Sequence, residues 1–389
     1  MSQKPVSSLP EQSRTSPFVY DLAVAGAGAS IMAAGGDGQL DKLDTNLAPL
    51  WTTTLRLDGK PLVDLAPAAD GSVAVATRDA GGNNVHLVSA TAAILQSWSL
   101  ANVVCRIARS SDGNTIYAGT ENSGVRALSS TTGATLWSDL KHAFYIVPGP
   151  SNRIYVAGDD TNNQPVVACL NSDGTRRWTY SVGGDWTFQA RSFAVHGDGR
   201  SVVGTRNHEL HAVSATGTQL WRQTGLGAAV VSLVIAGNDA VAGRGDGVVT
   251  RVTLASGAAV WSFDVGDRAD VLLAAADRVY VGTWHGVWAL DAGTGAVAWF
   301  RETQGGVLSL ARRSNRLYAG SRDGWVYCIE DPRGLVAIIP NLTDILGRGT
   351  VKVAPIKDWP GVRKPPVPPG PGPGPDPAPR PVRAVRSRA

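Results

Sequence analysis

Residues 279–299 read Val-Tyr-Val-Gly-Thr-Trp-His-Gly-Val-Trp-Ala-Leu-Asp-Ala-Gly-Thr-Gly-Ala-Val-Ala-Trp. Short apolar runs alternate with segments that contain Gly and Asp, which is typical of strands joined by tight turns. Extended to both sides, the pattern predicts four strands in one unit, at residues 271–275, 278–283, 287–290 and 296–300. A sheet this small cannot bury both faces alone, so copies of it must stack.

The unit is repeated, because tryptophans equivalent to Trp299 recur at intervals of 38 to 47 residues. Units of about 40–45 residues with four short strands are typical of propeller blades. An eighth copy of the strand motif, Leu-Tyr-Ala-Gly at residues 317–320, lacks a following marker tryptophan. We therefore predict an all-β fold, a single closed β-propeller of eight four-stranded blades, with seven blades as the alternative. The marker tryptophans are Trp51, Trp98, Trp137, Trp178, Trp221, Trp261 and Trp299.

Composition divides the chain into three parts. Residues 1–17 are polar and include three prolines, so we expect a flexible segment without the apolar core of a signal sequence. Residues 18–356 are assigned to the propeller, with either residues 351–356 or the segment before residue 18 expected to pair across the junction of the first and last blades. Residues 357–389 contain eleven prolines and a net charge of +5, which predicts a disordered, basic, Pro-rich tail.

Charge, hydropathy and cysteine content restrict the class of protein. The residues before the tail carry a net charge of about −1, so no basic face for nucleic acid is predicted. No apolar run is long enough to span a bilayer. Cys105, Cys169 and Cys328 lie far apart in apolar segments, where buried free thiols are expected. We expect a cytoplasmic protein, with a virion or exported assembly component as the alternative.

Residues 289–299 resemble the tryptophan-docking repeat of the pyrroloquinoline-quinone (PQQ)-like propeller superfamily, which runs A-x-D-x-x-T-G-x-x-x-W. Partial copies lie at residues 127–137, 212–221 and 254–261. The resemblance covers about 320 residues and implies an eight-bladed ring in which each tryptophan packs between adjacent blades against the Thr-Gly turn. The WD40 repeat has a similar period, but none of the seven tryptophans is followed by Asp, so the WD40 interpretation is rejected.

The resemblance does not imply quinone chemistry in this chain. Dehydrogenases of the superfamily carry an adjacent cysteine pair and a Glu/Asn/Asp set that holds calcium, and neither is recognisable in this sequence. His208 and His211 would face opposite sides of a strand and could not share a metal ion. We therefore predict a non-enzymatic member with no catalytic, cofactor-binding or metal-binding residues.

Four side chains outside the repeat register are candidate partner contacts: Trp186, Trp284, His285 and Trp325. Turns prefer small polar residues, so a tryptophan there either packs on its neighbour or is displayed to a partner, where tryptophan is enriched among binding hot spots.

The function predicted from these features is a non-catalytic protein-interaction scaffold that presents a rigid propeller face to a protein partner. The tail would add a tether, or a second contact to an acidic surface or to a domain that binds Pro-rich ligands. One alternative is a divergent quinoprotein-like enzyme or small-ligand sensor. The other is a structural surface module of a phage particle or injection machine.

Overall fold

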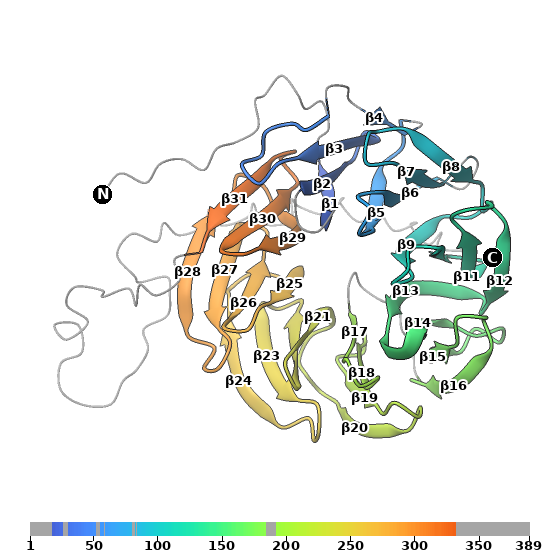
Figure 1. Cartoon of the computed structure of the whole chain (residues 1–389). Helices are drawn as coiled ribbons and strands as arrows, with labels where there is room; N and C mark the ends of the chain where they lie inside the picture. The colour runs from blue at the N-terminus through green and yellow to red at the C-terminus, as the bar shows by residue number, and fades with distance from the viewer. Residues whose placement is uncertain are drawn as a thin grey trace, which may run out of the picture. The chain divides into compact units, whose positions relative to one another are not determined.

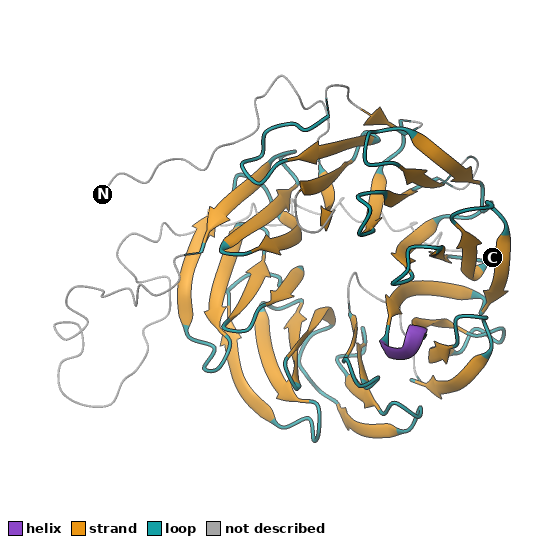
Figure 2. Ribbon diagram, viewed as in Figure 1, coloured by secondary structure: helices purple, strands orange, loops and turns teal. Residues whose placement is uncertain are grey.

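The computed structural model describes residues 18–25, 30–51, 55–57, 59–79, 82, 84–183 and 192–331. The chain divides into two compact units, residues 1–336 and 337–389, and all described residues belong to the first. The strands of this unit form eight antiparallel sheets arranged as a ring (Figure 1). Within the described ranges, one turn of 3-10 helix, η2 (Pro150–Asn152), is the only helical element (Figure 2). The predicted eight-bladed propeller is confirmed, and the seven-bladed alternative is wrong.

Each sheet is a meander whose strands pair in chain order, from an inner strand near the ring axis to an outer strand (Figure 1). Blade one contains β1 (Val19–Ala25), β2 (Ser30–Gly35), β3 (Gln39–Leu43) and β4 (Leu55–Arg56). Blade two contains β5 (Leu62–Pro67), β6 (Val73–Thr77), β7 (Val85–Val88) and β8 (Ile94–Trp98). Blade three contains β9 (Val104–Arg109), β10 (Thr115–Thr120), β11 (Gly124–Ser129) and β12 (Thr135–Asp139). Blade four contains β13 (His142–Pro148), β14 (Ile154–Asp159), β15 (Pro165–Leu170) and β16 (Arg176–Ser181).

The second half of the ring repeats this plan. Blade five contains β17 (Phe193–Val195), β18 (Ser201–Gly204), β19 (Leu210–Val213) and β20 (Gln219–Gln223). Blade six contains β21 (Val230–Ala236), β22 (Asp239–Arg244), β23 (Val248–Thr253) and β24 (Ala259–Asp264). Blade seven contains β25 (Val271–Ala274), β26 (Arg278–Gly282), β27 (Gly286–Asp291) and β28 (Val297–Glu302). Blade eight contains β29 (Val307–Arg313), β30 (Arg316–Ser321) and β31 (Val326–Glu330).

Blade eight has three strands within the described residues. The closing segments expected at residues 351–356 and before residue 18 lie outside the described residues. The expected boundary between propeller and tail, at residue 357, also lies outside them. In blade seven the predicted strand ends differ from the observed ones by at most two residues.

The core lies between blades. The second strands of blades three, four, seven and eight each bury a tyrosine of the recurring motif: Tyr117, Tyr155, Tyr280 and Tyr318. The glycine that ends the motif is needed because the next blade approaches closely. A Cβ on Gly282 would lie 2.7 Å from a methyl carbon of Val307 in blade eight, which no real side chain tolerates. The tyrosine of the motif therefore fills space in the core, and the glycine leaves room for the side chain of the neighbouring blade.

The ring is closed by packing of blade eight on blade one. Val19 and Leu22 of β1 share a hydrophobic cluster with Ala311 and Tyr318 of blade eight. The Tyr318 hydroxyl donates to the Thr45 carbonyl of blade one at 2.9 Å. The first and last sheets are therefore joined by the described residues themselves.

Candidate functional site

The seven marker tryptophans connect each blade to the next. The indole N–H of each donates a hydrogen bond of 2.8–3.0 Å to an acceptor in the following blade. The acceptors are the backbone carbonyls of Ala90, Gly133, Ser172, Ala215, Leu254 and Ala292, and the carboxylate of Asp331. The structure thus places these residues between blades, and their energetic contribution stays a prediction.

The Gly of the turn that receives a tryptophan is required by both conformation and space. Gly295 has a φ of 73°, in the left-handed region that favours glycine. A Cβ at Gly295 would lie 2.7 Å from Cδ2 of Trp261. The same contact joins Gly174 to Trp137, Gly217 to Trp178 and Gly257 to Trp221. The turn around this glycine, which is Thr-Gly at Gly217 and Gly295, therefore forms the surface on which the indole of the preceding blade lies.

Trp284 differs from the marker tryptophans because it is displayed. It lies in the turn between β26 and β27, and 52% of the residue is exposed. The guanidinium carbon of Arg322, from blade eight, lies 4.8 Å from the centre of the indole, in a cation–π contact. A Cβ on Gly306 would lie 3.1 Å from Cε3 of Trp284 and 3.3 Å from Cδ of Arg322. Gly306 thus leaves room for both side chains, and the indole is held in one orientation.

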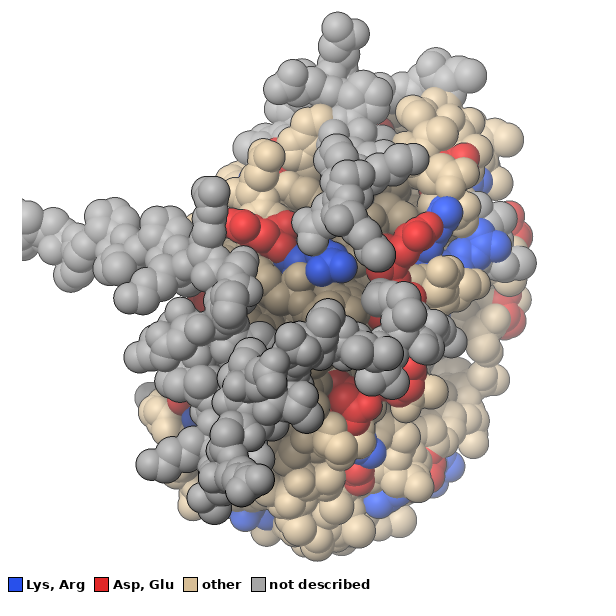
Figure 3. Space-filling model, turned by 90° about the vertical axis from the view of Figure 1, so that its left-hand side faces the viewer, with Lys and Arg blue, Asp and Glu red and all other residues tan. Residues whose placement is uncertain are grey.

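Charged side chains surround this Trp284–Arg322 pair. His285 Nδ1 lies 2.9 Å from a carboxylate oxygen of Asp267, and Arg268 Nε donates to Asp270 at 2.6 Å. Burial raises the pKa of Asp270, and the guanidinium of Arg268 opposes this shift. Where the ring is seen from its outer edge, acidic and basic side chains are intermixed among the residues drawn in colour (Figure 3). The arrangement favours specific polar contacts over a broad electrostatic field of one sign.

Two of the other candidate contacts have different outcomes. Trp325 is partly buried and packs on the hydrophobic cluster between blades eight and one, which includes Val19 and Leu22. Trp325 therefore packs on its neighbours and, unlike Trp284, is not displayed to solvent. Trp186 lies outside the described residues.

The sequence pattern placed His208 and His211 on one strand, which is wrong for His208, because His208 lies in the turn before β19. The surroundings of His211 were not predicted. His211 is fully buried. Its Nε2 lies 3.0 Å from a carboxylate oxygen of Glu209, and its Nδ1 lies 3.0 Å from the hydroxyl of Tyr180 in blade four. Arg222 donates to the same carboxylate at 2.6 Å. A lone histidine on a strand carries no signal for such a contact, because the partner tyrosine comes from another blade.

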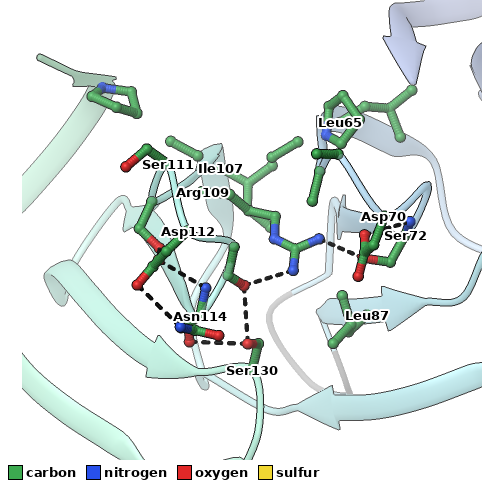
Figure 4. Close-up of a pocket in the computed structure, with 18 of the residues that line it drawn as sticks. Leu65, Asp70, Ser72, Leu87, Ile107, Arg109, Ser111, Asp112, Asn114 and Ser130 are labelled. Atoms are coloured by element: carbon green, nitrogen blue, oxygen red, sulfur yellow. Dashed lines mark hydrogen bonds between the residues drawn. The ribbon is translucent and has the colours of Figure 1, made fainter. Parts of the chain in front are cut away.

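A pocket at one end of the blades was not predicted from the sequence. This cavity of about 840 Å³ lies between blades two, three and four, and Arg109 projects into it from the end of β9 (Figure 4). Its lining draws on turns that are more than 40 residues apart in the chain, from Asp70 to Asn114. Such a site has no local motif.

The described part of the chain also bears on metal and redox chemistry. Among the described residues, no group of three or more His, Cys, Asp or Glu side chains could hold a metal ion. Cys105, Cys169 and Cys328 are free cysteines. Within the described ranges, no helix has the length and hydropathy that a membrane span requires.

Comparison with known proteins gives the same class. The PQQ_2 family model, described as outer membrane protein assembly factor BamB, matches residues 162–330. The match over residues 162–330, together with the propeller fold, supports the resemblance to the PQQ-like β-propeller superfamily. No curated protein shows significant sequence similarity to it.

Three solved structures share the architecture. BamB from Moraxella catarrhalis has a TM-score of 0.66 and 18% identity, over 84% of this chain and 99% of that one. Sqt1 from Saccharomyces cerevisiae has a TM-score of 0.72 and 14% identity, over 85% and 99% of the two chains. The computationally designed Ika8 protein has a TM-score of 0.69 and 18% identity, over 80% and 96%. At these identities the likeness establishes the fold, and function must be argued from the sites.

Proposed function

We propose that this protein is a non-catalytic scaffold that binds a protein partner through the Trp284–Arg322 pair on blades seven and eight. The observation that carries the proposal is the arrangement of Trp284, which is half-exposed, stacks with the guanidinium of Arg322 and packs over Gly306. Tryptophan and arginine are enriched at the energetic centres of protein interfaces. A side chain that is already ordered loses less conformational entropy on binding than a mobile one.

The free donors of Arg322 add to this argument. Within the described residues, its guanidinium takes part in no hydrogen bond or ion pair, and its backbone N–H donates to the Gly306 carbonyl at 2.8 Å. A guanidinium that stacks on an aromatic ring keeps its N–H groups free for an acceptor on a partner. The pair therefore offers an apolar surface and directional donors side by side. The name of the matched family model, an outer membrane protein assembly factor, supports a role with other proteins.

The experiment is affinity capture from native cells after photo-crosslinking, with mass spectrometry of the captured proteins. We expect the wild-type protein to enrich a defined partner that the variants Trp284→Ala and Arg322→Ala lose. Leu136→Ala is the matched control, because Leu136 is a comparably exposed apolar residue, 53% exposed, on the outer strand of blade three. Equal recovery of the partner by Trp284→Ala and wild type would place the interface elsewhere and overturn the proposal.

The quinoprotein-like enzyme is the competing hypothesis. It requires that purified protein retain quinone or calcium after incubation with both, which absorption spectra and metal analysis measure. Stoichiometric retention would favour that hypothesis over the scaffold. The cytoplasmic location stays a prediction, which fractionation of native cells can test.

A further inference from the structure

The pocket that contains Arg109 lies on the face of the ring opposite to Trp284. The pocket is lined by the turns β5–β6 and β9–β10, which join first to second strands, and by the turn β11–β12, which joins third to fourth strands. Trp284 lies in a turn from second to third strand. In an antiparallel meander these two kinds of turn lie at opposite ends of the strands. A ligand in the pocket therefore does not compete with a partner on Trp284.

Arg109 is a cation with hydrogen-bonding capacity to spare. Its two terminal nitrogens donate to the Ser72 hydroxyl at 2.7 Å and to the Gly113 carbonyl at 2.6 Å, both uncharged acceptors. Its Nε is buried and has no hydrogen-bond partner within the described residues. A guanidinium has five N–H donors, so two bonds to neutral oxygens leave it capable of binding a carboxylate. Partial burial, which lowers the pKa of Arg109, also strengthens its interaction with an anion.

Two carboxylates flank this cation. Asp70 and Asp112 lie on either side of Arg109 (Figure 4), and among the described residues neither forms an ion pair with it. Hydrogen bonds from Ser72 lower the pKa of Asp70, and a hydrogen bond from Ser110 lowers the pKa of Asp112, so both are ionised at neutral pH. The pocket therefore carries one positive and two negative charges. A simple anion would meet repulsion there, whereas a ligand with charges of both signs would not.

The rest of the wall combines hydroxyl and amide side chains, such as Ser111 and Asn114, with an apolar part. Leu65, Leu87, Ile107 and Ile146 contribute side chains that are otherwise buried in the blades. The volume, about 840 Å³, falls within the range of small-molecule sites, which combine an apolar lining with a few polar groups that fix orientation. The lining thus fits a small molecule with an aliphatic body and a charged end.

We propose that this pocket binds a small zwitterion with an apolar side chain, of the free amino acid or short-peptide class. The ligand carboxylate would accept hydrogen bonds from Arg109, and its ammonium group would pair with Asp70 or Asp112. The aliphatic side chain would contact Leu65, Ile107 and their neighbours. This site is independent of the scaffold function proposed for the opposite face.

Isothermal titration calorimetry of the full chain with three isosteric probes tests the proposal. L-Leucine carries both charges, 4-methylpentanoate lacks the ammonium group, and 3-methylbutylamine lacks the carboxylate. We expect saturable binding of leucine, weakened about tenfold or more when either charge is removed, as for the loss of a charge-assisted hydrogen bond. Arg109→Met should weaken the binding of leucine and leave the binding of 3-methylbutylamine unchanged. The double variant Asp70→Asn with Asp112→Asn should weaken the binding of leucine and should not weaken the binding of 4-methylpentanoate.

Two further variants keep the test decisive. Thr131→Trp places a large ring on the pocket lining from an exposed position and should abolish leucine binding even if Arg109→Met does not fold. Trp284→Ala, on the opposite face, should bind leucine like wild type. Absence of saturable binding up to about 10 mM leucine, a range that covers weak metabolite sites, would overturn the proposal. Equal affinity for the three probes would overturn it as well.

Discussion

Trp299 donates its indole N–H to a carboxylate oxygen of Asp331 at 2.8 Å, whereas the six other marker tryptophans donate to backbone carbonyls. The second oxygen of Asp331 accepts the hydroxyl of Tyr280 at 2.5 Å. Asp331 is buried, so its charge depends on these two donors. At the junction of blades seven and eight the acceptor of the indole hydrogen bond is therefore a side chain, whereas at the other six junctions it is a backbone carbonyl.

Replacing Trp299 with Phe should destabilise the protein more than replacing Trp261 with Phe. Both indoles are equally buried, at 8% exposure, but they leave different acceptors behind. The Ala292 carbonyl accepts a hydrogen bond from Arg251 as well as from Trp261, so it keeps a partner when Trp261 is replaced. When Trp299 is replaced, the buried carboxylate of Asp331 keeps the hydroxyl of Tyr280 as a donor and loses the indole N–H. An acceptor deprived of a partner costs about 1–3 kcal/mol. Denaturant unfolding measures the difference, and equal losses would contradict the special role of Asp331.

Trp221→Ala tests whether the interblade indoles hold the ring together. Trp221 is 9% exposed, and its indole lies against Gly257 of blade six. Removing it should cost about 3–5 kcal/mol, the range for deletion of a buried large aromatic side chain. Leu220→Ala is the control, because the adjacent Leu220 is 41% exposed and should change stability little. If Trp221→Ala melts like wild type, as Leu220→Ala is expected to do, the indole of Trp221 does not contribute to the stability of the ring.

Trp284→Ala and Trp325→Ala should differ in their effect on the melting temperature. Trp284 is exposed and contacts mainly Arg322 and Gly306, so its loss should leave the melting temperature almost unchanged. Trp325 packs on the cluster that closes the ring between blades eight and one, so its loss should lower the melting temperature clearly. Differential scanning calorimetry of the two variants decides between display and packing. A large loss for Trp284→Ala would mean that it is a core residue.

The repeat pattern predicted the propeller because the information for each blade is local. The Tyr-Val-Gly motif around Tyr280 encodes a buried strand with a close neighbour, and the Thr-Gly turn before Trp299 encodes the docking surface for Trp261. These features recur about every forty residues, so one clear copy identifies the degenerate ones.

The sites could not be predicted in the same way, because they join residues from different blades. Trp284 stood out in a turn where small residues are expected, but its partner Arg322 is 38 positions away and belongs to the next unit. The lining of the pocket combines Asp70 of blade two with Arg109 and Ser130 of blade three. A sequence pattern reveals what every blade shares, and a binding site depends on what one blade has and its neighbours lack.

The three thiols should be unreactive in the native protein. Burial raises the pKa of Cys105 to about 12 and also raises the pKa values of Cys169 and Cys328. The thiolate is the nucleophile, so at about pH 8 only about one Cys105 in ten thousand is in the reactive form. Iodoacetamide should therefore leave native protein unlabelled and modify all three cysteines in urea, as measured by mass spectrometry. Labelling of native Cys105 at the rate seen in urea would show that its environment is not the one described.

Stability should fall as the pH is lowered from about 8 to about 5, with His211 as one cause. Burial lowers the pKa of His211 below its ordinary value, an effect that the neighbouring Glu209 opposes but does not cancel. The unfolded chain takes up a proton on this side chain at about pH 6.5, before the native protein does. Unfolding is therefore favoured as the pH falls through that value, and the loss levels off below the native pKa. Melting temperatures in a series of buffers measure this slope.

The variant His211→Gln should flatten the slope, because it removes the group that binds the proton on unfolding. His208→Asn is the control: His208 lies in an exposed turn with a φ of 63°, a conformation that Asn adopts readily. Glu209, whose pKa is lowered by hydrogen bonds from Arg222 and His211 that outweigh its own burial, stays ionised throughout this range, so it does not contribute to the slope. An unchanged slope in His211→Gln, together with the wild-type slope in His208→Asn, would assign the pH dependence to other groups. A slope that disappears with His211 would instead show that the contact between blades four and five depends on a neutral imidazole.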